Sequence, residues 1–210
     1  MNQINYWKTY YDKPQKGKKP PSAPSLFAKF VQNMVNISDV KRIIDVGCGN
    51  GRDAYYFANE NDTIKVLGVD SAIASEKVKN VSFVMGSMGD LNDLIESKNV
   101  QTMLYSRFSL HSIPKDIQSK VLLYAKTNCK YISIEARSTK DPLSNGEKSN
   151  SVETSYAIPH YRRYIDLNGL VTELESLGFT IIHKSDSNEY APYKDQKPWC
   201  VRVLGINKNL

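Results

Sequence analysis

Residues 42–53 read Arg-Ile-Ile-Asp-Val-Gly-Cys-Gly-Asn-Gly-Arg-Asp, and this order of residue types predicts a strand, a bare turn and the start of a helix. The short β-branched run before the first glycine is typical of a buried strand, and the helix is expected to begin near Arg52. Gly47, Gly49 and Gly51 carry no Cβ, so a ligand could lie directly against the backbone. Free N–H groups at the start of a helix favour a negative group there. The stretch therefore predicts a loop that holds a small molecule.

The spacing of the glycines distinguishes this loop from a dinucleotide-binding fingerprint. That fingerprint has two residues between its second and third glycines, whereas this loop has one and is preceded by Asp45. A second apolar segment, residues 65–70, ends in Asp70. A carboxylate at the tip of the second strand can accept hydrogen bonds from both ribose hydroxyls of a nucleoside. Together the two signals predict a ligand that contains a nucleoside.

The pattern Asp-x-Gly-x-Gly-x-Gly resembles motif I of the class I methyltransferases that depend on S-adenosyl-L-methionine (SAM). The resemblance implies an α/β, Rossmann-like fold with a seven-stranded sheet of order 3-2-1-4-5-7-6 and helices on both faces. It also implies SAM as the methyl donor and S-adenosyl-L-homocysteine (SAH) as the product. In this scheme the glycines approach the methionine part of SAM, Arg52 meets its carboxylate and Asp70 binds the ribose. The predicted cofactor-binding residues are Asp45, Gly47, Cys48, Gly49, Gly51, Arg52, Asp70, Ser71, Ser87, Met88 and Ser106.

Two of these positions leave alternatives open. Asp45 is expected either to order the loop or to meet the amino group of SAM. In the methyltransferases that this chain resembles, the turn after the third strand often carries an acid that touches the adenine amino group. Here that turn holds Ser87 followed by Met88, which departs from the pattern. Met88 could stack on the base or be an ordinary core methionine.

The remaining periodicity predicts one domain of alternating strands and helices. Five strands alternate with helices, and the last two strands form an antiparallel pair at the edge of the sheet. Strands are expected at residues 43–46, 65–70, 81–85, 101–106, 131–136, 179–184 and 200–206, and helices at residues 26–34, 52–59, 90–97, 114–127 and 167–177.

Two segments lie outside this regular pattern. Residues 1–24 form an aromatic and basic N-terminal arm, a candidate lid that could equally pack on the body, and residues 25–210 form the methyltransferase domain. Within that domain, residues 138–165 lack regular periodicity and are rich in polar and turn residues. A loop this long inside a compact domain is usually functional or disordered, so we expect a substrate-side insertion here.

The composition limits the class of protein. A chain of 210 residues with 40% hydrophobic and 24% charged residues fits one α/β domain. No apolar run reaches membrane-spanning length and no leader segment is recognisable, so we expect a cytoplasmic protein that does not insert into membranes. The three cysteines show no paired spacing, which predicts neither a disulfide framework nor a metal site.

Two histidines are candidate catalytic residues. Methyl transfer from a sulfonium is an in-line displacement, and a nucleophile that carries a proton needs a base to remove it. His111 follows the fourth predicted strand, whose carboxyl end should face the reacting methyl group. His160 lies in the insertion. Imidazole titrates near neutrality, which suits a base, but each histidine could instead bind substrate or be a hydrogen-bonded structural residue.

Several arginines fall on segments expected at the same edge of the sheet. Paired guanidinium donors bind phosphate or carboxylate, so their convergence favours a small anionic acceptor. The formal net charge of +6 is compatible with such a substrate. One or two of the arginines could instead pair with Glu135 or Glu153. The predicted substrate-binding residues are Arg107, Arg137, Tyr161, Arg162 and Arg163.

Motifs outside the glycine loop extend the resemblance. Together with that loop, they look like small bacterial methyltransferases of surface-polysaccharide gene clusters, and in particular those linked to O-methyl phosphoramidate modification of capsules. The resemblance implies a phosphorylated or phosphoramidate-type acceptor in capsule polysaccharide biosynthesis. The motifs are Pro-Pro-Ser at residues 20–22, Phe-Ala at 27–28, Arg-Phe-Ser-Leu-His at 107–111, Glu-Ala-Arg-Ser at 135–138 and His-Tyr-Arg-Arg at 160–163.

Other functions remain open on the sequence. The excess of basic over acidic residues would also suit a nucleic-acid methyltransferase, whose affinity for nucleic acid should fall steeply with salt. However, no Asn/Asp-Pro-Pro-Tyr sequence follows the fourth strand, and relatives that methylate adenine or cytosine on nitrogen would be expected to carry one. A catalytically silent subunit that binds SAM would bind the cofactor without any turnover. A dinucleotide-dependent dehydrogenase is the weakest alternative, because the glycine spacing argues against it.

Overall fold

The computed structural model of the chain describes residues 6–8, 23–35, 37–72, 78–96, 101–144, 152–153, 159–192 and 196–210. In two short segments, 152–153 and 159–160, it describes the backbone and not the side chains.

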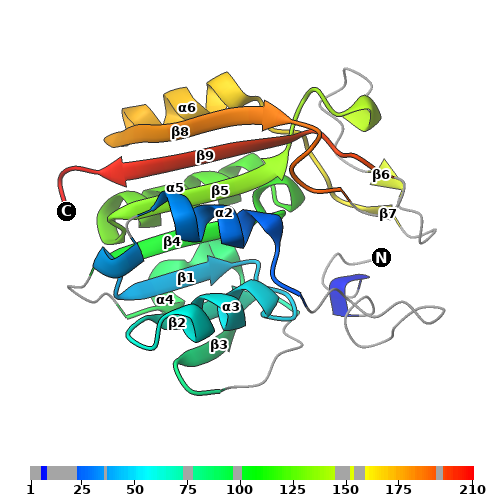
Figure 1. The fold of residues 1–210 in the computed structure, drawn as a ribbon. Coiled ribbons are helices and arrows are strands. Elements are labelled where there is room, and N and C mark those ends of the chain that lie inside the picture. The colour runs from blue at the N-terminus through cyan, green and yellow to red at the C-terminus, as the bar shows by residue number, and fades with distance from the viewer. Residues whose placement is uncertain are drawn as a thin grey trace.

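The fold is built on a seven-stranded sheet (Figure 1). Its strands run in the order β3 (Val81–Met85), β2 (Lys65–Asp70), β1 (Arg42–Val46), β4 (Thr102–Arg107), β5 (Tyr131–Arg137), β9 (Cys200–Asn207) and β8 (Phe179–Ser187). The first five strands are parallel, and β9 is antiparallel to both of its neighbours. A separate two-stranded sheet pairs β6 (Val152–Glu153) with β7 (Pro159–His160) inside the predicted insertion. With that small sheet set aside, the predicted order 3-2-1-4-5-7-6 is confirmed.

Helices cover both faces of the sheet. The helices are α2 (Leu26–Met34), α3 (Arg52–Glu60), α4 (Leu91–Leu94), α5 (Lys115–Asn128) and α6 (Leu167–Ser176), and the 3-10 turns are η2 (Ile37–Asp39), η3 (Met88–Asp90), η4 (Leu110–Ser112) and η5 (Pro142–Ser144). Helices α2 and α3 pack on one face, and α4, α5 and α6 pack on the other (Figure 1). None of the helices in the described part of the chain is long and apolar enough to cross a membrane.

Strand β1 shows why the sheet needs both helical layers. Every residue of this strand is buried, and successive side chains point to opposite faces. Ile43 therefore joins the core under α2 and α3, with Phe57, whereas Ile44 joins the core under α5, with Leu122. Burial on both faces is what parallel sheets require, and it explains the continuous apolar run in the sequence.

Local capping signals correctly predicted several helix ends. The Ser25 hydroxyl accepts a hydrogen bond from the Ala28 N–H at 3.0 Å and begins α2, and the Asp166 carboxylate accepts one from the Gly169 N–H at 2.7 Å and begins α6. Gly178 follows α6 with a φ of 92°, a value that favours glycine. The helix predicted at residues 90–97 is shorter in the structure. Asp90 belongs to the 3-10 turn η3, and α4 ends at Leu94.

A buried acid joins the two helices on the first face to the sheet. The Asp53 carboxylate accepts hydrogen bonds from the Ser25 N–H at 2.7 Å, the Ser25 hydroxyl at 2.7 Å and the Tyr105 hydroxyl at 2.8 Å. All three residues are buried. The start of α2, the start of α3 and strand β4 are therefore held at one point, directly beneath the glycine loop.

The replacement Asp53→Ala is expected to lower the free energy of unfolding by about 3 kcal/mol, because three buried donors lose their acceptor. Urea denaturation followed by circular dichroism measures this value. Asp62→Ala is the matched control: that side chain is exposed, so its removal should change the free energy by less than about 0.5 kcal/mol. A loss below about 1 kcal/mol for Asp53→Ala would contradict this role.

Candidate functional site

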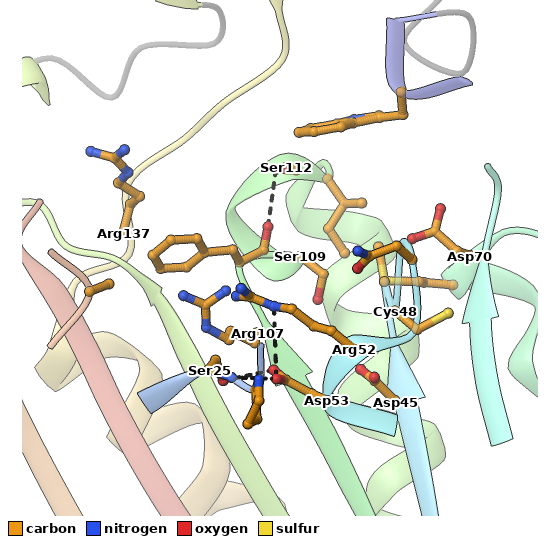
Figure 2. Close-up of a pocket in the computed structure, with 18 of the residues that line it drawn as sticks. Ser25, Asp45, Cys48, Arg52, Asp53, Asp70, Arg107, Ser109, Ser112 and Arg137 are labelled. Atoms are coloured by element: carbon orange, nitrogen blue, oxygen red, sulfur yellow. Dashed lines mark hydrogen bonds and ion pairs between the residues drawn. The ribbon is translucent and has the colours of Figure 1, made fainter. Parts of the chain in front are cut away.

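A pocket of about 730 Å³ opens at the carboxyl ends of the parallel strands (Figure 2). Ligands of open α/β sheets bind at this edge, where the direction of the strand order reverses, here between β1 and β4. The predicted site residues that line the pocket are Asp45, Gly47, Cys48, Arg52, Asp70, Ser71, Ser87, Met88, Arg107 and Arg137. Most of the predicted cofactor positions are thus brought together, although their roles stay predictions.

The glycine loop packs directly against the loop that follows β4. Gly47 has a φ of 75°, and a Cβ added there would lie 2.2 Å from the Ser109 Cβ. No side chain larger than hydrogen fits at this position. Gly51, with a φ of 71°, precedes α3 in the same left-handed conformation. Glycine at position 47 thus lets the two loops pack closely, and contact of this loop with a ligand stays a prediction.

Asp70 lies at the tip of β2 with its carboxylate already oriented. One oxygen accepts a hydrogen bond from the Gly49 N–H at 2.9 Å, and the other accepts one from the Ala72 N–H at 2.9 Å. Burial raises the pKa of Asp70, whereas these backbone hydrogen bonds act in the opposite direction. Each oxygen keeps further acceptor capacity toward the pocket, because a carboxylate oxygen has two lone pairs.

Asp45 is a second acid in the pocket and is almost completely buried, with 3% exposure. Burial raises its pKa well above the usual value, and the nearby carboxylates of Asp53 and Asp70 raise it further. Arg52 and Arg107 lower it, but by less. An acid in these surroundings is stabilised in its charged form by an added cation.

The Asp45 pKa leads to a prediction for the ligand-free protein. Because the folded-state pKa lies above the unfolded one, the favourable contribution of Asp45 is complete below about pH 4 and is lost as pH rises through the folded pKa. Asp45→Asn cannot ionise, so its stability relative to the wild type should rise as the pH increases. Thermal melts from pH 4 to pH 8 measure this difference. Asp116 is exposed, and Asp116→Asn is the control. If the stability difference between Asp45→Asn and the wild type did not change with pH, the electrostatic argument would be refuted.

Arginines gather on the other side of the pocket, around one buried acid. Glu135, which is fully buried, accepts hydrogen bonds from Arg107 Nε at 3.0 Å and from Arg202 Nε at 2.7 Å. Burial raises the Glu135 pKa, although the two arginines act in the opposite direction. Two guanidinium groups share one carboxylate, which leaves this cluster with an excess of positive charge, and Arg107 is its member that lines the pocket.

Arg137 adds a further cation to this side. It lines the pocket and forms an ion pair with Asp141, with 2.8 Å between Nη1 and Oδ2. Burial lowers the pKa of Arg162, and the nearby charge of Arg137 lowers it further. Figure 2 shows Asp45 and Asp70 on one side of the pocket and Arg137 on the other. We call the side with Asp45 and Asp70 the acidic half of the pocket and the side with Arg107 and Arg137 the basic half. Arg52 also lines the pocket, with its Nε 3.8 Å from Asp53 Oδ1.

Several predicted residues lie away from the pocket. Arg163 was predicted to bind substrate, but its guanidinium donates to the carbonyls of Ile113 at 2.8 Å and Leu110 at 3.0 Å and to the Gln118 side chain. Its role here is to hold the loop after β4. Ser106, predicted to bind cofactor, is fully buried and bonded to Ser109 at 2.6 Å between hydroxyl oxygens. The other predicted residues that are described and do not line the pocket are Gly49, Gly51, His111, Tyr161 and Arg162.

The two candidate bases are placed differently. His111 is buried behind the pocket wall, and its Nδ1 accepts a hydrogen bond from the Arg137 N–H at 3.1 Å. That nitrogen is occupied and cannot take a proton from an acceptor in this arrangement. The His160 side chain lies outside the described residues, and its role stays a prediction. Within the described part of the chain, no cluster of histidine, cysteine and acidic side chains could hold a metal ion.

Among the pocket residues that were not predicted as site residues from the sequence are Asp53, Phe108 and Tyr190. Asp53 carried a signal, because it stands one helical turn before Phe57 and therefore on the inward face of α3. Phe108 has a φ of 56°, which is unusual for a bulky residue, and the Arg107 guanidinium lies 4.4 Å from its ring centroid. The Arg202 guanidinium lies over the Tyr190 ring, with 4.0 Å between its Cζ and the ring centroid. Neither arrangement has a sequence signature.

Comparison with known proteins bears on the fold. No protein-family model matches the chain, and no curated protein matches it. Solved structures do match. A 1,6-didemethyltoxoflavin-N1-methyltransferase from Burkholderia thailandensis, solved with 1,6-didemethyltoxoflavin and SAH, is 14% identical with a TM-score of 0.67, over 98% of this chain and 86% of that chain.

Two further neighbours give the same result. A SAM-dependent methyltransferase from Methanosarcina mazei is 13% identical with a TM-score of 0.65, over 85% of this chain and 96% of that chain. The CcbJ methyltransferase from Streptomyces caelestis is 15% identical with a TM-score of 0.64, over 98% and 99%. The chain has the class I methyltransferase fold. In a methyltransferase fold, the pocket described above lies at the expected sheet edge.

Proposed function

We propose that the chain is a SAM-dependent methyltransferase that transfers a methyl group to a small anionic acceptor. The observation that carries the proposal is the acid pair beside the bare glycine loop. Asp70 is oriented by two backbone N–H groups at the tip of β2, and Asp45 is buried beneath the loop. These are the groups that a ribose and a cationic amino acid moiety require.

The residues present fit the cofactor. Gly47 lines the pocket, and its glycine is required because Ser109 fills the space that a side chain would occupy. Asp70 would accept the ribose hydroxyls and Asp45 would meet the ammonium group of the methionine part. Ser87 and Met88, which line the pocket after β3, would lie near the adenine. When bound, SAM supplies a methyl group activated on a sulfonium.

The chain itself supplies orientation and charge. In-line displacement needs the acceptor held against the donor in a site that excludes water. The basic half of the pocket lies beside the acidic half, so an anionic acceptor on the arginines would face a donor on the acids. Burial and the neighbouring carboxylates raise the pKa of Asp45, and a cationic donor beside it would favour the charged form.

The arginines support the choice of acceptor. Arg107 and Arg137 both line the pocket, and Arg202 adds a third guanidinium through the shared Glu135. Guanidinium groups bind phosphate and carboxylate through paired donors. The motifs that resemble methyltransferases of polysaccharide clusters favour a phosphorylated or phosphoramidate-type acceptor in capsule synthesis. The basic half of the pocket suits that chemistry.

The N-terminal arm fits the proposal as a cover for the pocket. Trp7 lines the pocket and Tyr6 is buried, with their ring centroids 4.9 Å apart. An aromatic side chain over a reaction site excludes water. We propose that the N-terminal arm, residues 1–24, acts as a lid on the methyltransferase domain at residues 25–210, which has a substrate-side insertion at about 138–165. Within this arm the structure describes residues 6–8 and 23–24.

Calorimetric titration with SAH tests the central assignment. The wild type should bind with micromolar affinity, and Asp70→Ala should weaken binding about 30-fold or more, since two charge-assisted hydrogen bonds to the ribose are lost. Asp116→Ala, an exposed acid on α5, is the control and should bind like the wild type. The proposal would be overturned if the folded wild type did not bind SAH, or if it bound NADH instead.

A further inference from the structure

His111 makes a specific contact with the backbone of the basic half of the pocket. It lies in η4, directly after β4, and is 3% exposed. Its Nδ1 accepts a hydrogen bond from the Arg137 N–H at 3.1 Å. A ring nitrogen that accepts a hydrogen bond carries no proton. The neutral imidazole of His111 therefore holds its proton on Nε2.

The sheet geometry explains why a histidine ring is needed at this point. The ladder between β4 and β5 ends with Arg107 opposite Glu135, and the Glu135 carbonyl still accepts from the Phe108 N–H at 2.9 Å. The next N–H on this side of β5 belongs to Arg137, but the chain has already turned away into η4. The His111 ring therefore supplies the acceptor that a longer strand would have provided.

Both ends of this contact are held by one segment, residues 163–165. The Arg163 N–H donates to the His111 carbonyl at 2.8 Å, and the Ile165 N–H donates to the Arg137 carbonyl at 2.8 Å. The Arg163 guanidinium also binds two carbonyls of the same loop. The loop and the end of β5 are thus joined directly by the ring of His111 and indirectly by this segment.

Arg137 is consequently held at both ends. Its backbone is fixed by His111 and Ile165, and its guanidinium is fixed by Asp141 at 2.8 Å while still lining the pocket. A guanidinium that is oriented before binding loses less entropy when it takes an anion. Burial of His111 protects the contact from competition by water.

We propose that His111 is a positioning residue, whose Nδ1 holds the backbone of Arg137 so that the guanidinium is preorganised for the anionic group of the acceptor. This inference rests on the proposed function, because it concerns the acceptor half of the same pocket. It replaces the expectation that His111 removes a proton from the acceptor. Asparagine can reproduce the contact, since its Oδ1 occupies the place of Nδ1.

The first experiment is nitrogen NMR of the purified, SAH-loaded protein, which reports the tautomer of each histidine ring. His111 should show an unprotonated Nδ1 and a protonated Nε2 at neutral pH. A ring protonated on Nδ1 would overturn the proposal, because it could not accept from the Arg137 N–H.

The second experiment measures inorganic phosphate binding to the SAH-loaded protein by chemical-shift titration. His111→Ala should raise the phosphate Kd about tenfold, and Arg137→Ala should raise it at least as much. His111→Asn should stay within about threefold of the wild type, because the acceptor is restored. His183→Ala is the matched control: this histidine is on β8, bonded to Ser185, and should leave phosphate binding unchanged.

The outcomes separate this inference from the proposed function. The His111 variants should bind SAH like the wild type, because His111 does not line the pocket. A protein that binds no SAH overturns the proposed function and this inference with it. If SAH binds normally, three results would overturn this inference alone. They are an unchanged phosphate Kd in His111→Ala, a Kd raised as much in His111→Asn as in His111→Ala, and a wild type that binds no phosphate.

Discussion

The site depends on the close approach of two loops that leave adjacent strands at the same edge of the sheet. The loop after β1 and the loop after β4 meet at Gly47 and Ser109, where an added Cβ would come within 2.2 Å of its neighbour. Nothing larger than hydrogen fits at Gly47, and the loop contributes Gly47, Cys48 and Asn50 to the lining of the pocket. The buried Asp53 network beneath the loop holds α2, α3 and β4 in the positions that make this approach.

Charge is divided across the pocket in a way that follows from the strand order. β1 and β2 deliver the acids Asp45 and Asp70 to the pocket, whereas β4 and β5 deliver Arg107 and Arg137. A sulfonium donor is a cation, and the proposed acceptor is an anion. In the proposed function, each reactant would have a complementary side of the pocket. Glu135 keeps the arginines in place without neutralising all of their charge.

Local features of the fold were predictable because they depend on neighbours in the sequence. The strand, glycine loop and helix at residues 42–60, the caps at Ser25 and Asp166, and the closing pair of antiparallel strands all follow from short-range patterns. The acid at the tip of β2 was predictable for the same reason. The strand order itself came from resemblance and not from periodicity.

The chemistry of the acceptor half was less predictable, because it depends on contacts between distant residues. Glu135 and Arg202 are 67 positions apart, and Arg163 reaches Leu110 across 53 positions. Arginine composition alone could not distinguish Arg163, which holds a loop, from Arg137, which lines the pocket. The same holds for His111, whose position after β4 suggested a base but whose Nδ1 is bonded to the backbone of β5.

The most direct test of the central claim is a crystal structure of the protein grown with SAH. The ribose hydroxyls should lie within hydrogen-bonding distance of the Asp70 carboxylate, with the methionine part against the backbone of residues 47–51 and its ammonium group beside Asp45. SAH bound elsewhere, or bound in this pocket with no contact to Asp70, would contradict the assignment of the glycine loop and the two acids as the cofactor site.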